Sequence, residues 1–317
     1  MDSDSSLDVV NSALYRYKKT NFLFKDPMRP KDLDALLDLE LRPTDVFLVT
    51  YPKSGSVWMQ QILVQIMDIV HPEQAEDLIN RNRVPWVEDR LFDEPFRDRP
   101  DPRYFGSHLP VDMLPRVKHA GFSSQVVYVW RNPRDVLVSL YHFSEAWVFL
   151  ESPKSFEDFF QDFLNGDVYM GSWFDHVRGY QAELFVFYID ENIDCLCRDR
   201  QDLRGEVEKL CLFLGQSLTE EQMDRVVETS TFNNMKVNPK ANYKDLVEKE
   251  RYSKNTMRKG VAGDWKNHFT VAQNERFDQN QPRRGGETVS VPGTFFNRGA
   301  DGQSGGDLHL QQHEGQP

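Results

Sequence analysis

The stretch "DVFLVTYPKSGSVWMQQIL", residues 45–63, decides the fold of this chain. Its run Val46–Thr50 is rich in β-branched residues and is ended by a proline and a glycine, which predicts a short strand followed by a loop. From Val57 onward the pattern turns helical. The loop therefore leads into a helix N-terminus, where unpaired N–H groups and the helix dipole attract anions. Lys53 and two serines in the same loop strengthen the expectation of an anion site.

This loop differs from the phosphate-binding loop of nucleoside triphosphatases. That loop reads G-x-x-x-x-G-K-[ST], whereas Lys53 precedes Gly55 here. On these residues alone, an ordinary strand-to-helix turn with an exposed lysine explains the stretch as well as an anion site does.

The alternation of strand and helix recurs along the chain. Gln125–Trp130 predicts a second strand with a helix after it, Glu183–Tyr188 a third strand, and Gly205–Gly215 a further helix. Such alternation predicts an α/β fold, with a parallel sheet flanked by helices on both faces. Ligands of such sheets lie beyond the carboxyl ends of the strands. Because Lys53 and Arg131 each follow a strand, we expect the two side chains to converge.

The composition limits the kind of partner. The 317 residues suffice to bury a core, and the formal net charge is −12. This acidic balance argues against a nucleic-acid-binding surface, so an anion site must be a local basic pocket. No signal peptide is visible, and the most apolar window, Val57–Val70, is too polar for a membrane span. Three cysteines, an odd number, favour a reducing compartment, so we expect a cytoplasmic protein without a membrane or nucleic-acid partner.

Two further segments carry cations beside small or hydroxyl-bearing residues. "RNPRDVLVS" places Arg131 at a strand end and Ser139 two helical turns later, although Arg131 could instead pair with Asp135 on the surface. "MRKGVAGDWK" places Arg258 and Lys259 before two glycines, although a solvated basic turn explains this segment too. With Lys53, the segments supply four cations for a ligand with at least two phosphate-like groups.

The aromatic residues Trp58 and Phe232 could stack on an adenine, although either could equally be a core residue. "CLC" (Cys195 to Cys197) lacks companion ligands at the spacing of a metal site, so no metal is expected.

Five motifs occur in one order along the chain: "TYPKSGSVW", "SHLP", "RNPRDVLVS", "GSWFDH" and "RKGVAGDWKNHFTVAQNERFD". These motifs, with their order and approximate spacing, resemble those of the cytosolic sulfotransferase family, and the resemblance covers roughly residues 40 to 278. The steroid and alcohol branch is closest, and the amine-type branch is also similar. The resemblance implies a P-loop-like nucleotide-binding core of the sulfotransferase type. It further implies transfer of a sulfonate from 3′-phosphoadenosine 5′-phosphosulfate (PAPS) to a hydroxyl or an amine.

Each motif of the resemblance carries a group of donor-binding residues. The implied phosphosulfate loop with its adenine-stacking tryptophan comprises Lys53, Ser54, Gly55, Ser56, Val57 and Trp58. The two implied clamps for the 3′-phosphate are Arg131 with Ser139, and Arg258 with Lys259 and Gly260. The implied adenine contact comprises Ser230, Thr231 and Phe232, and the implied strand tyrosine is Tyr188.

The resemblance also assigns the chemistry. His108, in "YFGSHLP", matches the catalytic histidine, and a group that titrates near neutral pH suits removal of a proton from the attacking acceptor. Without the motif, a structural role for this histidine would be favoured. Lys53 is placed to stabilise charge on the departing phosphate. Trp86, Trp147 and Phe149 fall where family members line the acceptor pocket. The similarity to the steroid and alcohol branch implies a steroid-like alcohol as the acceptor, with a phenol or an amine as the alternative.

The segment Lys266–Glu275 fits the dimer motif K-x-x-x-T-V-x-x-x-E of the family. The resemblance thus implies a homodimer through these residues, whereas an amphipathic stretch with ordinary surface charges is the alternative.

The chain also departs from the family pattern. Gly106 stands where some phenol-type members carry a lysine, the connection "YIDENIDCLCRDRQDLRGE" is longer than usual, and the chain diverges after "NERFD". We expect a sulfotransferase domain over residues 1–278 and a disordered tail over 279–317, rich in Gly, Gln and Pro. These departures leave open an inactive protein that binds PAPS or a hydrophobic ligand. A P-loop kinase is a further alternative.

Overall fold

Four parallel strands form the central sheet, in the order β5 (Tyr104–Ser107), β4 (Val46–Thr50), β6 (Gln125–Trp130) and β7 (Val186–Asp190). The computed structural model describes residues 7–25, 29–88, 98–115, 125–181, 186–190, 200–280, 283–284 and 287–288. For residues 186–190, 200–202, 283–284 and 287–288 only the backbone is described.

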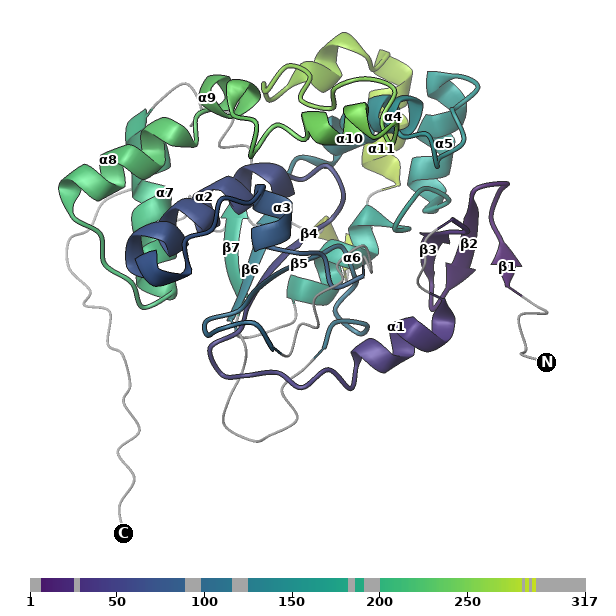
Figure 1. The fold of residues 1–317 in the computed structure, drawn as a ribbon. Coiled ribbons are helices and arrows are strands. Elements are labelled where there is room, and N and C mark those ends of the chain that lie inside the picture. The colour runs from purple at the N-terminus through teal and green to yellow at the C-terminus, as the bar shows by residue number, and fades with distance from the viewer. Residues whose placement is uncertain are drawn as a thin grey trace. The chain divides into compact units, whose positions relative to one another are not determined.

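Helices cover both faces of this sheet (Figure 1). Alternate residues of β4 point to opposite faces, so Val46 and Leu48 pack with α2 (Ser56–Val70), α7 (Arg200–Phe213) and α8 (Glu220–Thr229) in one core. On the other face, Phe47 packs against Phe105, and Tyr128 against side chains of α6 (Trp173–Gln181). The predicted α/β fold with a parallel sheet between helices is therefore confirmed.

The other elements of residues 1–281 surround this core. The side chain of Asn21 connects the antiparallel sheet β1-β2-β3 to the segment that follows α5 (Phe156–Asn165). It donates to the carbonyls of Gly166 and Val168, each at 2.8 Å. The bounds are β1 (Asp8–Val9), β2 (Leu14–Tyr17), β3 (Thr20–Leu23), α1 (Pro30–Leu36), η1 (Pro72–Gln74), α3 (Asn80–Arg83), α4 (Pro133–Ala146), α9 (Phe232–Val237), α10 (Lys244–Glu248), η4 (Asp264–Asn267) and α11 (Val271–Gln279).

The predicted strands Val46–Thr50 and Gln125–Trp130 have the observed bounds. The third strand lies at Val186–Asp190, two residues later than predicted at its carboxyl end. Sequence reasoning missed β5, whose four residues are too few to show an alternating pattern, although this strand leads directly to His108.

Residues 1–281 form one compact unit and residues 282–317 a second one. Of the second unit, the structure describes an antiparallel pair, β8 (Arg283–Arg284) and β9 (Glu287–Thr288). Most of the predicted tail lies outside the described residues, as does the part of the long connection from 191 to 199. The domain boundary at residue 278 and the disorder of the tail stay predictions.

Candidate active site

The loop between β4 and α2 has a backbone that few sequences adopt. Lys53 has a φ of 70° and Gly55 a φ of 109°, both in the left-handed region. Glycine adopts this region freely, whereas for lysine it is unusual and costs about 1–3 kcal/mol. No side chain among the described residues caps the N-terminus of α2, and the buried hydroxyl of Ser54 has no hydrogen-bond partner among them. The uncapped start of α2 thus leaves backbone N–H groups that could bind an anion.

Arg131 follows β6 and reaches this loop. Its Nη1 donates to the backbone carbonyl of Lys53 at 3.3 Å. Two helical turns along α4, Ser139 lines the same cavity as Lys53 and Arg131. The convergence expected from the two strand ends is therefore present in the structure. Asp135, the alternative partner of Arg131, accepts hydrogen bonds from the backbone N–H groups of Gly263 at 2.7 Å and Trp265 at 3.0 Å.

The third basic segment is organised around one acidic residue. Arg258 and Lys259 donate to the carboxylate of Asp264 at 2.6 and 2.7 Å. Although burial opposes it, hydrogen bonds from Lys259, Asn267 and Arg258 hold the pKa of Asp264 below its usual range. This carboxylate balances only one of the two positive charges, so the segment retains a positive surplus.

Gly260 and Phe232 fit together closely beside this segment. Gly260 has a φ of +63°, and a Cβ there would lie 2.4 Å from the ring of Phe232. A side chain at position 260 would therefore displace the phenylalanine, which begins α9 and lines the cavity.

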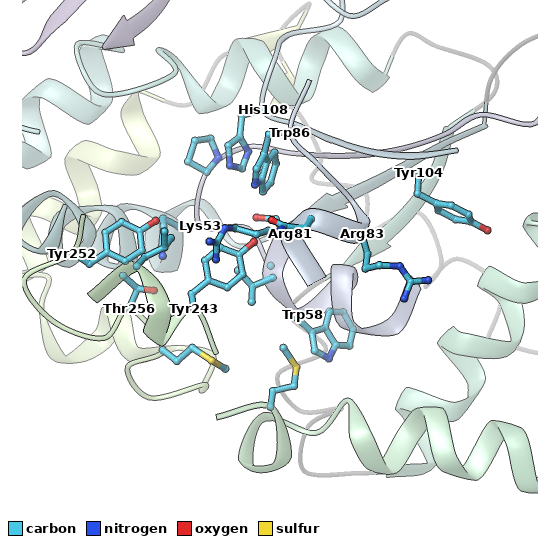
Figure 2. Close-up of a pocket in the computed structure, with 18 of the residues that line it drawn as sticks. Lys53, Trp58, Arg81, Arg83, Trp86, Tyr104, His108, Tyr243, Tyr252 and Thr256 are labelled. Atoms are coloured by element: carbon cyan, nitrogen blue, oxygen red, sulfur yellow. The ribbon is translucent and has the colours of Figure 1, made fainter. Parts of the chain in front are cut away.

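The three segments line one cavity of about 1210 Å³, and the predicted acceptor residues line it too. Figure 2 shows Lys53, Trp86 and His108 among its lining residues. Of the residues implied by the resemblance, it is lined by Lys53, Gly55, Ser56, Val57, Trp58, Trp86, His108, Arg131, Ser139, Trp147, Phe149, Phe232, Arg258, Lys259 and Gly260. This volume exceeds that of a typical single-ligand pocket, about 300–1,000 Å³, and suits two ligands side by side.

Four of the implied donor residues are placed differently. Ser54 and Ser230 are fully buried and are not among the lining residues, and the carbonyl of Ser230 accepts a hydrogen bond from Nε1 of Trp58 at 3.0 Å. The hydroxyl of Thr231 donates to the carbonyl of Glu228 at 3.1 Å and makes no capping bond to α9. Tyr188 lies in β7 opposite Tyr128, and its side chain lies outside the described residues.

The imidazole of His108 has a defined tautomer. Nδ1 lies 2.7 Å from the carbonyl of Thr50 and 3.1 Å from the hydroxyl of that residue. Because a carbonyl only accepts, Nδ1 carries the proton and Nε2 presents a lone pair. Burial lowers the pKa of His108 to about 4, the bond to the Thr50 carbonyl opposes this shift, and the charge of Lys53 adds to it. At neutral pH this group is therefore an unprotonated base.

The backbone of His108 is held from two sides. Its N–H donates to Oε1 of Glu88 at 2.6 Å. Its carbonyl lies 3.1 Å from Nε2 of His176, which must donate. The hydroxyl of Tyr128 in turn lies 2.8 Å from Nδ1 of His176 and donates to it, and burial lowers the pKa of His176 to about 3. Sequence reasoning gave His176 no role, although it ends the quoted motif "GSWFDH".

Aromatic side chains form the wall of the cavity around Phe143, Trp147 and Tyr252. Their ring centroids lie 5.1–6.3 Å apart, and Phe143 also contacts Nζ of Lys53, which lies 4.4 Å from its ring centroid. Phe149 continues this wall 6.2 Å from Trp147. An apolar ring system is the kind of ligand that such a wall accommodates.

The predicted dimer segment runs from within η4 into α11, and Val271, the first residue of α11, is 77 % exposed. No group of three or more His, Cys, Asp or Glu side chains suited to a metal ion occurs among the described residues, and Cys195 and Cys197 lie outside them. Within the same residues, no helix is long and apolar enough to cross a membrane.

Comparisons with known proteins place the chain in a family. Residues 43–282 match the Sulfotransferase domain family. The chain is 39 % identical over 283 residues to the amine sulfotransferase of Oryctolagus cuniculus, covering 86 % of this chain and 91 % of that protein. It is 39 % identical over 246 residues to the 3-beta-hydroxysteroid sulfotransferase of Cavia porcellus, covering 75 % and 83 %.

A solved structure agrees with these sequence relatives. Mouse sulfotransferase SULT7A1 complexed with PAP superposes with a TM-score of 0.69 at 29 % identity, covering 85 % of this chain and 94 % of that one. The basic cavity and the half-buried imidazole described above thus lie in a chain that belongs to the sulfotransferase family.

Proposed function

We propose that this sulfotransferase transfers a sulfonate from PAPS to the hydroxyl of a small apolar acceptor, with His108 as general base. One observation gives the proposal its main support. A neutral imidazole with its Nδ1 proton bonded to the Thr50 carbonyl lines the same cavity as Lys53, Arg131 and Arg258. A base, a charge-stabilising cation and two further cations for a distant phosphate are the groups that such a transfer needs.

The residues present fit the donor. When bound, PAPS supplies an activated sulfonate on a good leaving group. The loop from Lys53 to Trp58 would hold the 5′-phosphosulfate, because α2 begins there without a side-chain cap. Arg131, Ser139 and Arg258 would hold the 3′-phosphate, and the indole of Trp58, fixed by its bond to Ser230, would stack on the adenine.

The protein performs two tasks in the reaction itself. His108 accepts the acceptor's hydroxyl proton at Nε2 as the acceptor oxygen forms its bond to sulfur. Lys53 stabilises the negative charge left on the phosphate oxygen when the sulfur–oxygen bond breaks. Alignment of the two reacting groups comes from binding both in one cavity, which turns a bimolecular encounter into an intramolecular step.

The acceptor is proposed to be an uncharged, steroid-like alcohol. The wall of Phe143, Trp147 and Phe149 suits an apolar ring system. Lys25 and Arg251 lie 5.5 and 4.8 Å from the ring centroid of Phe149, and their positive charges would repel a protonated amine there. The names of the relatives include both a steroid and an amine enzyme, and a phenol or an amine therefore remains the alternative.

A transfer assay with labelled PAPS and a panel of steroids, phenols and amines tests the proposal. The variant His108→Ala should lose transfer while it retains affinity for adenosine 3′,5′-bisphosphate (PAP), and Lys53→Ala should lose most of the rate. The variant His71→Ala, at a histidine outside the cavity lining, is the matched control. Full activity of His108→Ala would remove the proposed base.

Calorimetry with PAP separates the enzyme from the alternative of an inactive binder. PAP binding without transfer to any acceptor would select the binder, and no PAP binding at all would reject both. The cytoplasmic location and the homodimer through Lys266–Glu275 stay predictions.

A further inference from the structure

The segment Pro85–Glu88 lies along the edge of β5 as a short extra strand. The N–H of Gly106 donates to the carbonyl of Pro85 at 2.8 Å, and the N–H of Val87 donates to the carbonyl of Gly106 at 3.0 Å. These bonds form a parallel bridge that pairs Trp86 with Gly106. The position of Trp86 relative to the strand is therefore fixed by backbone hydrogen bonds.

The indole of Trp86 occupies the space that a side chain at position 106 would need. A Cβ on Gly106 would lie 3.0 Å from Cε3 and 3.2 Å from Cδ2 and Cζ3 of the indole. The backbone of Gly106 is that of an ordinary strand residue, so no positive φ requires a glycine there. The crowding that a side chain at position 106 would meet thus comes from the indole of Trp86, which would have to shift.

The same indole covers the proposed base. Its ring lies 4.3 Å from that of His108, centroid to centroid, with 28° between the planes, and Figure 2 shows the two rings side by side. Because Nδ1 of His108 is bonded to Thr50, an acceptor can reach only Nε2, and Trp86 lines the cavity next to it. A displaced indole would change both the wall that an acceptor meets and the water around the imidazole.

We propose that Gly106 determines acceptor specificity through Trp86. The glycine lets the indole lie flat against β5 and over His108, which provides a planar platform for a rigid polycyclic alcohol that presents its hydroxyl to Nε2. A larger side chain at position 106 lifts the indole and removes this platform, while the donor-binding segments, which lie on other elements, are unchanged. The inference rests on the proposed role of His108 as base.

Two substitutions with two probe acceptors test the inference. The variants are Gly106→Ala and Gly106→Val, and the acceptors are a 3β-hydroxysteroid and 4-nitrophenol, a small planar phenol. With Gly106→Val, kcat/KM should fall at least about tenfold for the steroid and less than about threefold for the phenol. Gly106→Ala should shift the ratio in the same direction by less, and PAP affinity should stay within about twofold of wild type in both.

A double-mutant cycle separates an effect through Trp86 from a general loss. In a Trp86→Ala background, Gly106→Val should cause no further fall in kcat/KM, because the ring that it displaces is gone. Additive losses, or equal losses for the two acceptors, would overturn the inference.

A titration of His108 by NMR tests the same geometry without catalysis. Burial lowers the pKa of His108 to about 4 in the wild type, so a lifted indole that admits water should raise it toward 6.5 in Gly106→Val. An unchanged pKa would count against the proposed coupling. A wild-type protein that transfers to neither acceptor would count against the proposed function, and this titration would then decide the inference by itself.

Discussion

Asp135 links two segments of the proposed donor site that are more than a hundred residues apart. Its carboxylate is buried at 3 % exposure in the first turn of α4, the helix that carries Ser139. It accepts the backbone N–H of Gly263 at 2.7 Å and that of Trp265 at 3.0 Å, the residues on either side of Asp264, which begins η4. The substitution Asp135→Ala removes both bonds and leaves two amide groups without their acceptor.

The expected loss of stability follows from these two bonds. A hydrogen bond to a charged group contributes about 1.5–3 kcal/mol. Gly263 and Trp265 are only partly buried, so water can replace some of the loss and the lower value applies to each. The free energy of unfolding should therefore fall by about 3 kcal/mol, a large part of the 5–15 kcal/mol of a typical domain. Asp135→Asn should cost about 2 kcal/mol, because the two N–H groups bond to different carboxylate oxygens and asparagine keeps only one oxygen.

The same substitution should weaken donor binding. Arg258, Lys259 and Gly260 lie just before the anchored turn, so their placement depends on it. Loss of the anchor should raise the Kd for PAP at least about tenfold, since a misplaced charged hydrogen bond costs 1.5–3 kcal/mol.

Urea unfolding and calorimetry with PAP measure the two effects. Asp112→Ala, at an exposed aspartate, is the matched control and should stay within about 0.5 kcal/mol of the wild type. Stability of Asp135→Ala within the same range would refute the anchor. A loss of stability with unchanged PAP affinity would show that the anchor does not support the clamp.

Four further predictions follow from other contacts. Because burial lowers the pKa of His108 to about 4 and of His176 to about 3, the unfolded chain binds more protons than the folded one below about pH 6.5. Stability in urea should thus fall by about 2 kcal/mol per histidine from pH 7 to pH 5, and equal stabilities would contradict their burial. His176→Phe, which removes the donor to the His108 carbonyl, should lower kcat about ten- to a hundredfold with PAP affinity kept, and His176→Gln should restore part of the rate. An equal loss of PAP affinity would instead indicate a general structural defect. Gly260→Ala should weaken PAP binding by about 2 kcal/mol in equilibrium dialysis, because its Cβ meets the ring of Phe232, and unchanged binding would exclude this contact from the site. Val271→Glu should turn a dimer into a monomer in size-exclusion chromatography, whereas a wild-type monomer would remove the dimer prediction.

The sequence was sufficient to predict the parts of the site that follow strands. Lys53 and Arg131 each come directly after an apolar strand, and parallel strands end at one edge of a sheet, so their convergence follows from local patterns alone. The identity of the base was different, because one histidine among eight carries no local sign of its role. Only the resemblance singled out His108.

Contacts between distant segments could not be predicted in this way. The bond from Asp135 to Gly263 joins residues 128 positions apart, and no periodicity relates them. The stack of Trp86 on His108 depends on a four-residue strand that is too short to recognise. His176 supports the base through the backbone carbonyl of His108, and because every residue has such a carbonyl, no sequence pattern indicates this bond. Packing across the chain, rather than local propensity, decides such features.

These contacts divide the site into two halves with separate supports. The donor half depends on α4 and η4, which Asp135 joins, and the base half depends on β5 and α6, which His176 joins. Neither residue contacts the other's partners in the hydrogen bonds described, so each half should respond to its own substitution. Loss of Asp135 should appear chiefly in PAP affinity, and loss of His176 chiefly in kcat. The double variant of Asp135 and His176 should lose transition-state free energy equal to the sum of the two single losses. A loss much larger or smaller than that sum would show that the two halves share a support and form one cooperative unit.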